Sequence, residues 1–239
     1  MSKIEMLNNA AHANVKIKLD RAPSLGDDVM FCMTYPFEFR LALSHYPIVV
    51  YRDKANDTAF PITLFGFEEG ENLFLDSSGW NARYIPIMVQ RQPFSIGFQQ
   101  LKDSEERQQV ITFNPEHPRV NTTEGEAVFD EQGNFTPYLE KVIKMLESID
   151  VGHQQNKLLI EALDKYELLE DSTIAITLKD GTSYELVGFS TIADDKFEAL
   201  SAEALKDLND QKLLLPITMI MASMSNLGNL VDIRNARLG

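Results

Sequence analysis

Residues 136–170, TPYLEKVIKMLESIDVGHQQNKLLIEALDKYELLE, constrain the fold of this chain most strongly. Thr136 suits a helix cap, and Pro137 suits the first helical position, where a backbone N–H is not needed. Apolar residues then recur at intervals of three and four, as on the buried face of an amphipathic helix. They are Leu139, Val142, Ile143, Leu146, Ile149, Leu158, Leu159, Ala162 and Leu163. The pattern predicts one long helix with a possible break at Gly152, because glycine costs a helix about 1 kcal/mol.

The first half of the chain contains short strand patterns separated by polar turns. Residues 48–53, 59–67 and 73–76 are expected to form an antiparallel meander, because each is an apolar or β-branched run bounded by a turn. Residues 94–101 and 107–114 are two further strand candidates around a charged turn. A strand at 15–22, a short helix at 36–47 and another short helix after Trp80 complete the expected elements of this half.

The second half adds a hairpin and further helices. Asp180-Gly181 lies between two alternating patterns in residues 172–192, which predicts a β-hairpin. Residues 194–211 and 212–237 read as helices. We therefore expect an α+β fold with a mainly antiparallel N-terminal sheet, then a long helix, a β-hairpin and C-terminal helices. The chain is expected to be a single domain, 1–239, with a possible subdivision into a β-rich part, 1–120, and a helix-rich part, 121–239.

Charge and hydropathy restrict the partners and the compartment. The chain has 36 acidic and 22 basic residues and a formal net charge of −14, which disfavours nucleic acid as a partner. No apolar signal region opens the chain, and residues 213–224 are too short for a membrane span and contain Pro216. These features predict a cytoplasmic protein without a membrane span. The same apolar segment is expected to cover the sheet or, if uncovered, to form a homodimer interface.

The sequence shows no clear motif for a metal site or a cofactor site. The four histidines, His12, His45, His117 and His153, are dispersed without metal-ligand spacing. Residues 129–135 lack the alternation of a calcium loop. A phosphate-binding glycine loop and a dinucleotide fingerprint are both missing from the sequence. We therefore expect no metal and no cofactor, and we expect Cys32 to be a buried, unreactive thiol among apolar neighbours.

The best candidate for a binding site is the segment GENLFLDSSGWNARYIPIMVQRQPF, residues 70–94. It combines Trp80, Arg83, Tyr84 and Arg91, and tryptophan, tyrosine and arginine are enriched at binding hot spots. If a helix extends from Arg83 to Arg91, the two arginines lie about two turns apart on one face. The segment therefore predicts a ligand- or partner-binding surface, and packing within the core remains the alternative.

A second candidate lies in the loop NPEHPR, where Glu116 and His117 are adjacent. A histidine beside a carboxylate can act as a general base, although a loop salt bridge is the alternative. The enzymatic hypothesis is a pocket built from Arg83, Arg91, Glu116 and His117, with the catalytic residues unknown. Whether the chain is an enzyme stays open at this stage.

The order of several segments resembles the bacterial SapC family. The resembling segments are residues 45–50, 70–86, 91–94, 122–140, 186–200 and 223–233. The resemblance implies a soluble protein, often encoded near halogenase-like flavoenzymes and TonB-dependent receptors, and it offers no catalytic residues. It favours a cytoplasmic binding or accessory protein whose partner is an unidentified protein, peptide or small molecule. An enzyme of uncommon type is the alternative.

Overall fold

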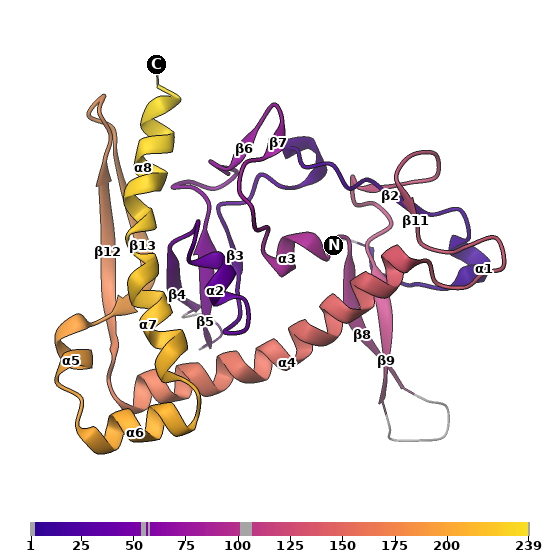
Figure 1. Cartoon of the computed structure of the whole chain (residues 1–239). Helices are drawn as coiled ribbons and strands as arrows, with labels where there is room; N and C mark the ends of the chain where they lie inside the picture. Colours follow the sequence, from indigo (N-terminus) through magenta and orange to yellow (C-terminus); the bar gives the residue numbers. More distant parts are fainter. Residues whose placement is uncertain (1–2, 54–55, 57, 101–106, 239) are drawn as a thin grey trace.

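The largest sheet joins strands from both halves of the chain. The computed structural model describes residues 3–53, 56, 58–100 and 107–238. The sheet has the order β12-β13-β4-β5-β3, and every neighbouring pair in it is antiparallel (Figure 1). Its strands are β3 (Phe31–Met33), β4 (Ile48–Asp53), β5 (Thr58–Leu64), β12 (Leu169–Thr177) and β13 (Ser183–Ile192). Together with the helices below, it confirms the expected α+β class.

The hairpin β12–β13 forms where the sequence predicts it. Gly181 has a φ of +88°, in the left-handed region that glycine adopts without strain. The Leu178 amide donates to the Thr182 carbonyl and closes the turn at 2.8 Å. The hairpin then joins the N-terminal strands through Phe189 beside Tyr51, so strands far apart in the sequence share one sheet.

The expected three-strand meander is only partly correct. β4 and β5 pair as predicted. The predicted pairing of the third strand was wrong, because β6 (Leu75–Asp76) pairs with β7 (Gly79–Trp80) and not with β5. The other neighbour of β5 is β3, whose three residues are too short to show an alternating pattern.

The opposite end of the molecule carries two small sheets. The predicted strands β8 (Phe94–Gln100) and β9 (Arg107–Phe113) pair with each other, and β1 (Glu5–Met6) joins β9. The turn predicted at 102–106 lies outside the described residues. The strand expected at 15–22 is reduced to β2 (Lys16–Ile17), which lies between β10 (Val120–Asn121) and β11 (Glu126–Ala127). The helix α1 (Asn9–His12) lies in the same region.

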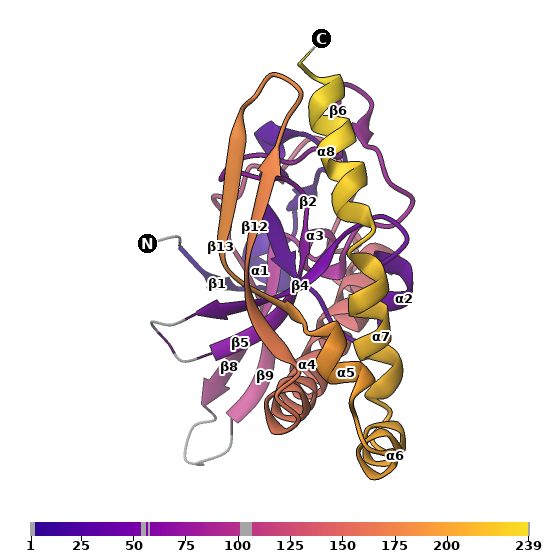
Figure 2. The same cartoon turned by 90° about the vertical axis from the view of Figure 1, so that its left-hand side faces the viewer.

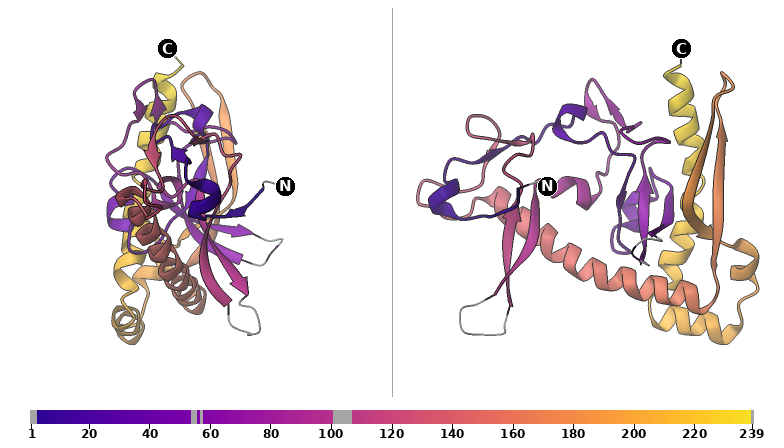
Figure 3. Two further views of the ribbon diagram at one scale, coloured as in Figure 1. Left: turned by 90° about the vertical axis from the view of Figure 1, so that its right-hand side faces the viewer. Right: turned by 180° about the vertical axis from the view of Figure 1, so that it is seen from behind.

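The long helix α4 (Pro137–Lys165) runs from one end of the molecule to the other (Figures 1 and 3). Its cap is the predicted one, since the Thr136 hydroxyl accepts from the Leu139 amide at 3.3 Å. The possible break at Gly152 does not occur. A Cβ there would lie 2.5 Å from Cδ1 of Tyr35, so the glycine serves close packing rather than a change of direction.

Two hydrophobic clusters lie on either side of the middle of α4. Leu139, Leu146 and Ile149 belong to one cluster, together with Phe94 and Phe113 of the small sheet. The C-terminal part of α4 contributes to the other cluster, which contains the large sheet and the C-terminal helices. Both clusters include residues before and after residue 120. The subdivision at 120/121 stays a prediction.

Helices of the C-terminal part cover one face of the large sheet (Figure 2). Ile217 and Ile220 of α7 are buried, and the Ser223 hydroxyl accepts from the Ile48 amide of β4 at 2.8 Å. The predicted packing of this segment on the sheet is therefore confirmed. The helices along the sheet are α7 (Leu214–Ser223) and α8 (Asn226–Ala236), and two shorter helices, α5 (Asp194–Glu198) and α6 (Ala202–Asp210), lie near the end of β13 (Figure 1).

Among the described residues, one helical stretch meets the length and hydropathy criteria for a membrane span. It is Leu214–Ala236, which consists of α7 and α8. The apolar window within it is 39% buried inside the protein. A core helix of a globular protein meets the same criteria, so this finding is weak evidence for a membrane.

The two short helices of the N-terminal half are shorter than expected. The helix predicted at 36–47 is limited to α2 (Phe39–Ala42). The helix α3 (Ile87–Gln90) begins after Pro86 and makes a single turn. Arg83 lies outside it, so the condition for placing Arg83 and Arg91 on one helix face is not met, because the backbone at Pro86 is extended ahead of the helix.

Candidate ligand-binding site

A cavity of about 240 Å³ lies between α3, β8 and the middle of α4. It is lined by Met88, Arg91, Ser95, Ile96, Phe98, Leu146, Ile149, Asp150 and His153. Most of these side chains are apolar, and a few polar groups converge on the same space. Pockets for drug-sized molecules usually measure about 300 to 1,000 Å³, so this cavity suits a smaller molecule or the end of a chain.

Arg91 is held at the cavity by the short helix and the strand that follows it. The Arg91 amide donates to the Ile87 carbonyl at 2.9 Å and closes α3. The Gln92–Pro93 peptide bond is cis, and β8 begins at Phe94. The guanidinium donates to the Phe94 carbonyl and approaches the Met88 sulfur at 3.4 Å. The backbone on both sides thus fixes where the side chain points.

The charge of Arg91 has no carboxylate partner among the residues that the structure describes. Within the described part of the chain, Arg91 forms no ion pair with any aspartate or glutamate. Burial is the main cause that lowers the pKa of its guanidinium below the ordinary arginine value, and the side chains of Tyr35 and Cys32 oppose that effect. An arginine remains charged in proteins. A half-buried positive charge that lacks a counter-ion is a natural partner for an anion.

His153 lies on the α4 side of the same cavity. Its Nε2 atom is 3.3 Å from the hydroxyl of Tyr35, which is fully buried and also donates to the Met88 sulfur at 3.4 Å. Burial is the largest cause that lowers the pKa of His153, Asp150 opposes it, and the charge of Arg91 adds to it. The imidazole is therefore neutral at neutral pH, and Arg91 is the cation that lines the cavity.

The cavity does not contain the arrangement of a hydrolytic enzyme. Ser95 lines it, but its hydroxyl shares a hydrogen bond of 2.9 Å with the Thr112 hydroxyl. Among the described residues, no hydrogen bond joins Ser95 to His153, so the serine has no general base. Burial raises the pKa of the Cys32 thiol, which contacts the Thr63 hydroxyl at 3.4 Å, as expected for an unreactive cysteine.

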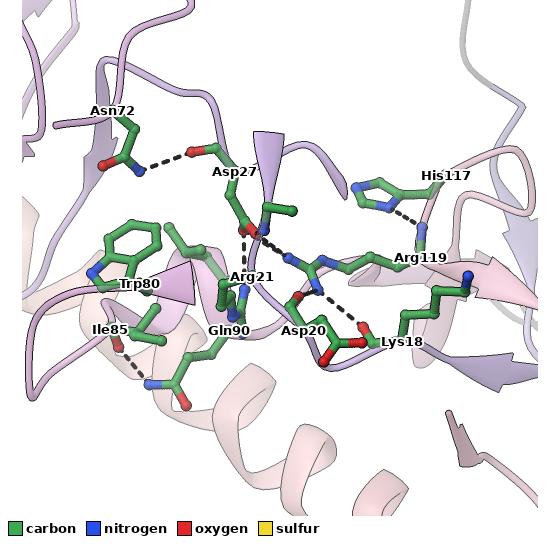
Figure 4. Close-up of polar contacts among 12 residues, drawn as sticks. Lys18, Asp20, Arg21, Asp27, Asn72, Trp80, Ile85, Gln90, His117 and Arg119 are labelled. Atoms are coloured by element: carbon green, nitrogen blue, oxygen red, sulfur yellow. Dashed lines mark hydrogen bonds and ion pairs between the residues drawn. The ribbon is translucent and has the colours of Figure 1, made fainter. Parts of the chain in front are cut away.

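A second charged cluster is built around Asp27 and Arg119 (Figure 4). Both residues are almost fully buried, and Arg119 Nη2 lies 2.7 and 2.6 Å from the two carboxylate oxygens. Arg119 Nη1 also donates to the carbonyls of Lys18 and Asp20, and Arg21 reaches the same carboxylate at 3.2 Å. The carboxylate accepts hydrogen bonds from several sides, so this cluster ties chain segments together.

Trp80 and Tyr84 meet through Tyr46. The Trp80 indole N–H donates to the Tyr46 hydroxyl at 2.9 Å, and that hydroxyl donates to the Tyr84 carbonyl. The Tyr84 hydroxyl donates to the buried carboxylate of Glu38. The Trp80 ring also packs edge-on against Phe65, with ring centroids 5.1 Å apart. These contacts favour a role in packing for both aromatic residues.

Glu38 is the buried carboxylate at the centre of that network. It accepts from the Thr34 hydroxyl at 2.8 Å and from the Ile87 amide at 3.1 Å, in addition to Tyr84. Burial is the largest cause of the raised pKa of Glu38, and these hydrogen bonds oppose it. The carboxylate joins the start of α2 to the start of α3, and so supports the turn that presents Arg91.

The remaining predicted site residues lie apart from the cavity. Arg83 is exposed, and its charge contributes to the lowered pKa of His45 after the larger effect of burial. Glu116 is exposed, and its amide donates to the Asn114 side chain at 2.9 Å. His117 accepts from the Arg119 amide at 3.3 Å (Figure 4). Of the four residues in the enzymatic hypothesis, only Arg91 lines the cavity.

The sequence pattern does not single out two residues near Arg91. They are His153, which lines the cavity, and Tyr35, whose hydroxyl contacts His153. One signal was present: Gly152 stands within a strong helical pattern, directly before His153. A glycine that persists in a helix interior often marks a close approach of another group, and here that group is the Tyr35 ring.

Comparison with protein families identifies the chain. A family model described as SapC matches residues 7–230, which is nearly the whole length. The chain belongs to the SapC family. Neither the curated proteins nor the solved structures include a match to this SapC chain. The matched region contains all the resembling segments except residues 231–233.

Proposed function

We propose that this SapC-family chain is a binding protein whose cavity beside Arg91 takes a small ligand with a carboxylate and an apolar group. The observation that carries this proposal is the guanidinium of Arg91, which lines an apolar cavity without a carboxylate partner among the described residues. A ligand carboxylate would supply the missing charge, and the guanidinium fork would orient it.

The cavity walls define the rest of the ligand. Met88, Leu146 and Ile149 offer an apolar surface, so a short aliphatic or aromatic group fits beside the carboxylate. The imidazole of His153 is neutral at neutral pH, so it can donate or accept a hydrogen bond to the ligand. Arg91 then remains the group that pairs with the ligand carboxylate. This combination supports a small organic acid or a chain terminus as the ligand.

The cellular role is part of the same proposal. The resemblance to SapC proteins implies an accessory protein that acts in the cytoplasm with halogenase-like flavoenzyme or TonB-receptor systems. A cavity without a nucleophile and base pair agrees better with such a binding role than with catalysis. Trp80, Arg83 and Tyr84 are a proposed partner surface of the same chain.

Calorimetric titration with phenylpropionate and its neutral amide tests the proposal. We expect the acid to bind the wild-type protein, and the amide to bind at least about tenfold more weakly, because it cannot pair with Arg91. Arg91→Gln is expected to lose the preference for the acid. The matched control is Arg52→Gln on β4, whose exposed pairing with Asp164 lies outside the cavity.

Two results would contradict the proposed function. Equal binding of the acid and the amide would show that the guanidinium does not recognise the carboxylate. Unchanged affinity for the acid in Arg91→Gln would show that the ligand binds elsewhere. Circular dichroism of each variant establishes that the fold is intact before the affinities are compared.

A further inference from the structure

An apolar groove lies on the surface between α2, α4 and the start of α7. Its volume is about 460 Å³, and it is separate from the cavity at Arg91, with which it shares no lining residue. Four large apolar side chains line it and remain 43 to 54% exposed: Phe37, Leu41, Leu158 and Leu215. Clusters of exposed apolar side chains of this kind mark interaction surfaces more often than scattered ones do.

The charged residues of the groove are all positive. Its full lining is Pro36, Phe37, Arg40, Leu41, Gln155, Leu158, Gln211, Lys212, Leu213, Leu215, Pro216 and Met219. The cations are Arg40 and Lys212, and neither forms an ion pair with a described acidic residue. The chain has 36 acidic and 22 basic residues, so a groove whose charged lining residues are both cations differs from the average composition of the chain.

Lys212 also occupies an unusual backbone position. Its φ is +61°, in the left-handed region that follows a helix end and that glycine normally fills. A lysine there is strained relative to glycine, and ending the helix does not require a charged side chain. Strain of this kind is retained where the side chain has a use.

We propose that this groove binds a short amphipathic segment of a partner protein, with apolar residues on one side and acidic residues beside them. The exposed leucines would take the apolar anchors, as in helix-in-groove recognition. Arg40 and Lys212 would pair with the flanking carboxylates and set the direction of the segment. This proposal is independent of the ligand proposed for the Arg91 cavity.

Charge complementarity distinguishes this partner from a second copy of the chain. In a symmetric dimer, the same patch on each copy faces the other. Two grooves placed face to face would bring Arg40 and Lys212 of one copy toward the same cations of the other, which is unfavourable. An acidic partner removes that conflict.

Two synthetic helical peptides test the proposal by fluorescence anisotropy. Both peptides carry leucine at positions i, i+3, i+4 and i+7. All remaining positions are glutamate in the first peptide and lysine in the second. The net charge of −14 would favour the lysine peptide if binding were nonspecific. We expect the glutamate peptide to bind about tenfold more tightly, because it pairs with both cations of the groove.

Variants separate binding from folding. Lys212→Gly is expected to raise the thermal unfolding midpoint, because it relieves the left-handed backbone, and at the same time to weaken the glutamate peptide several-fold. Leu41→Glu is expected to abolish binding. The matched controls are Lys196→Gln on α5 and Val187→Glu on β13, both exposed and outside the groove, and both are expected to bind normally.

Three results would overturn the proposal. The first is equal or tighter binding of the lysine peptide, and the second is the absence of binding by both peptides. The third is a dimer in sedimentation, or attachment to phosphatidylcholine vesicles, that Leu41→Glu abolishes. That result would assign the groove to a second copy or to a lipid surface instead.

Discussion

Two arginines of the N-terminal half, Arg119 and Arg91, have opposite surroundings. Arg119 is buried against Asp27, with both carboxylate oxygens within 2.7 Å, and it also donates to two backbone carbonyls. Arg91 is partly buried beside a cavity and donates to one carbonyl, and it forms no ion pair with a described carboxylate, although Asp150 lines the same cavity. The charge of the first arginine is neutralised within the fold by Asp27, whereas the second can still pair with an anion.

The difference between a paired and an unpaired arginine separates a structural role from a binding role in this chain. A buried ion pair that is fully hydrogen-bonded stabilises the structure only while both partners are present. A guanidinium that lines a cavity without a partner contributes less to stability, and retains its capacity to bind. The contrast therefore predicts separate effects of mutation on folding and on ligand binding.

The largest expected effect is at the buried pair. Asp27→Ala leaves Arg119 without its counter-ion and should lower the free energy of unfolding by about 3 to 5 kcal/mol. Arg91→Met should cost about 1 kcal/mol, because only hydrogen bonds to a carbonyl and a sulfur are lost. Urea denaturation measures both. Similar losses for the two variants would contradict the comparison.

A smaller effect is expected at Gly152. Gly152→Ala gains helix propensity, but its Cβ would lie 2.5 Å from Cδ1 of Tyr35 and 2.9 Å from Cε1 of Phe37. We expect a net loss of about 1 to 3 kcal/mol and weaker phenylpropionate binding, because Tyr35 contacts His153 in the cavity. The matched control is Gly228→Ala in α8, where no atom lies within 4 Å of the new Cβ. That variant should gain up to about 1 kcal/mol. A stabilised Gly152→Ala would show that the Tyr35 ring can move away.

The pH dependence of stability should change at Glu38. Burial raises its pKa above the ordinary 4.5, so the folded state keeps the proton at pH values where the unfolded state has lost it. Its contribution to stability is complete below about pH 4.5 and is lost as the pH rises through the folded pKa. Glu38→Gln keeps an acceptor for Tyr84 and removes this loss, so its free energy of unfolding should vary less over that window. An identical pH profile for the variant and the wild type would be the contrary result.

The smallest expected effect is at the surface. Arg52 pairs with Asp164 at 2.9 Å, and both side chains are substantially exposed. Arg52→Gln should change the free energy of unfolding by less than about 1 kcal/mol, because solvent screens the pair and its geometry is not fixed by burial. If Arg52→Gln lowered the free energy of unfolding as much as Asp27→Ala, burial would not explain the difference between the exposed and the buried ion pair.

Elements with strong local signals could be predicted from the sequence. The cap at Thr136, the apolar pattern of α4 and the turn at Asp180-Gly181 each act over a few residues. Elements defined by distant contacts could not. The three-residue β3 exists because β5 pairs with it, and α3 has a single turn after Pro86.

The candidate site depends even more on distant contacts. Arg91 was predicted from its neighbours in the sequence, but the cavity forms only when α4 brings His153 next to it. The buried pair joins Asp27 to Arg119 across most of the N-terminal half, and no periodic pattern links residues so far apart. The sequence therefore predicts Arg91 as one cation of the site. It does not show which arginine lacks an ion pair with a described carboxylate in the folded chain.

The most direct test of the account follows the Arg91 side chain itself. Nuclear magnetic resonance can monitor the Nε–H signals of the arginines while phenylpropionate is added to the wild-type protein. We predict a saturable shift of the Arg91 signal, with the Arg119 signal unchanged because its carboxylate partner is already in place. An unshifted Arg91 signal under conditions where the acid binds would contradict the central claim.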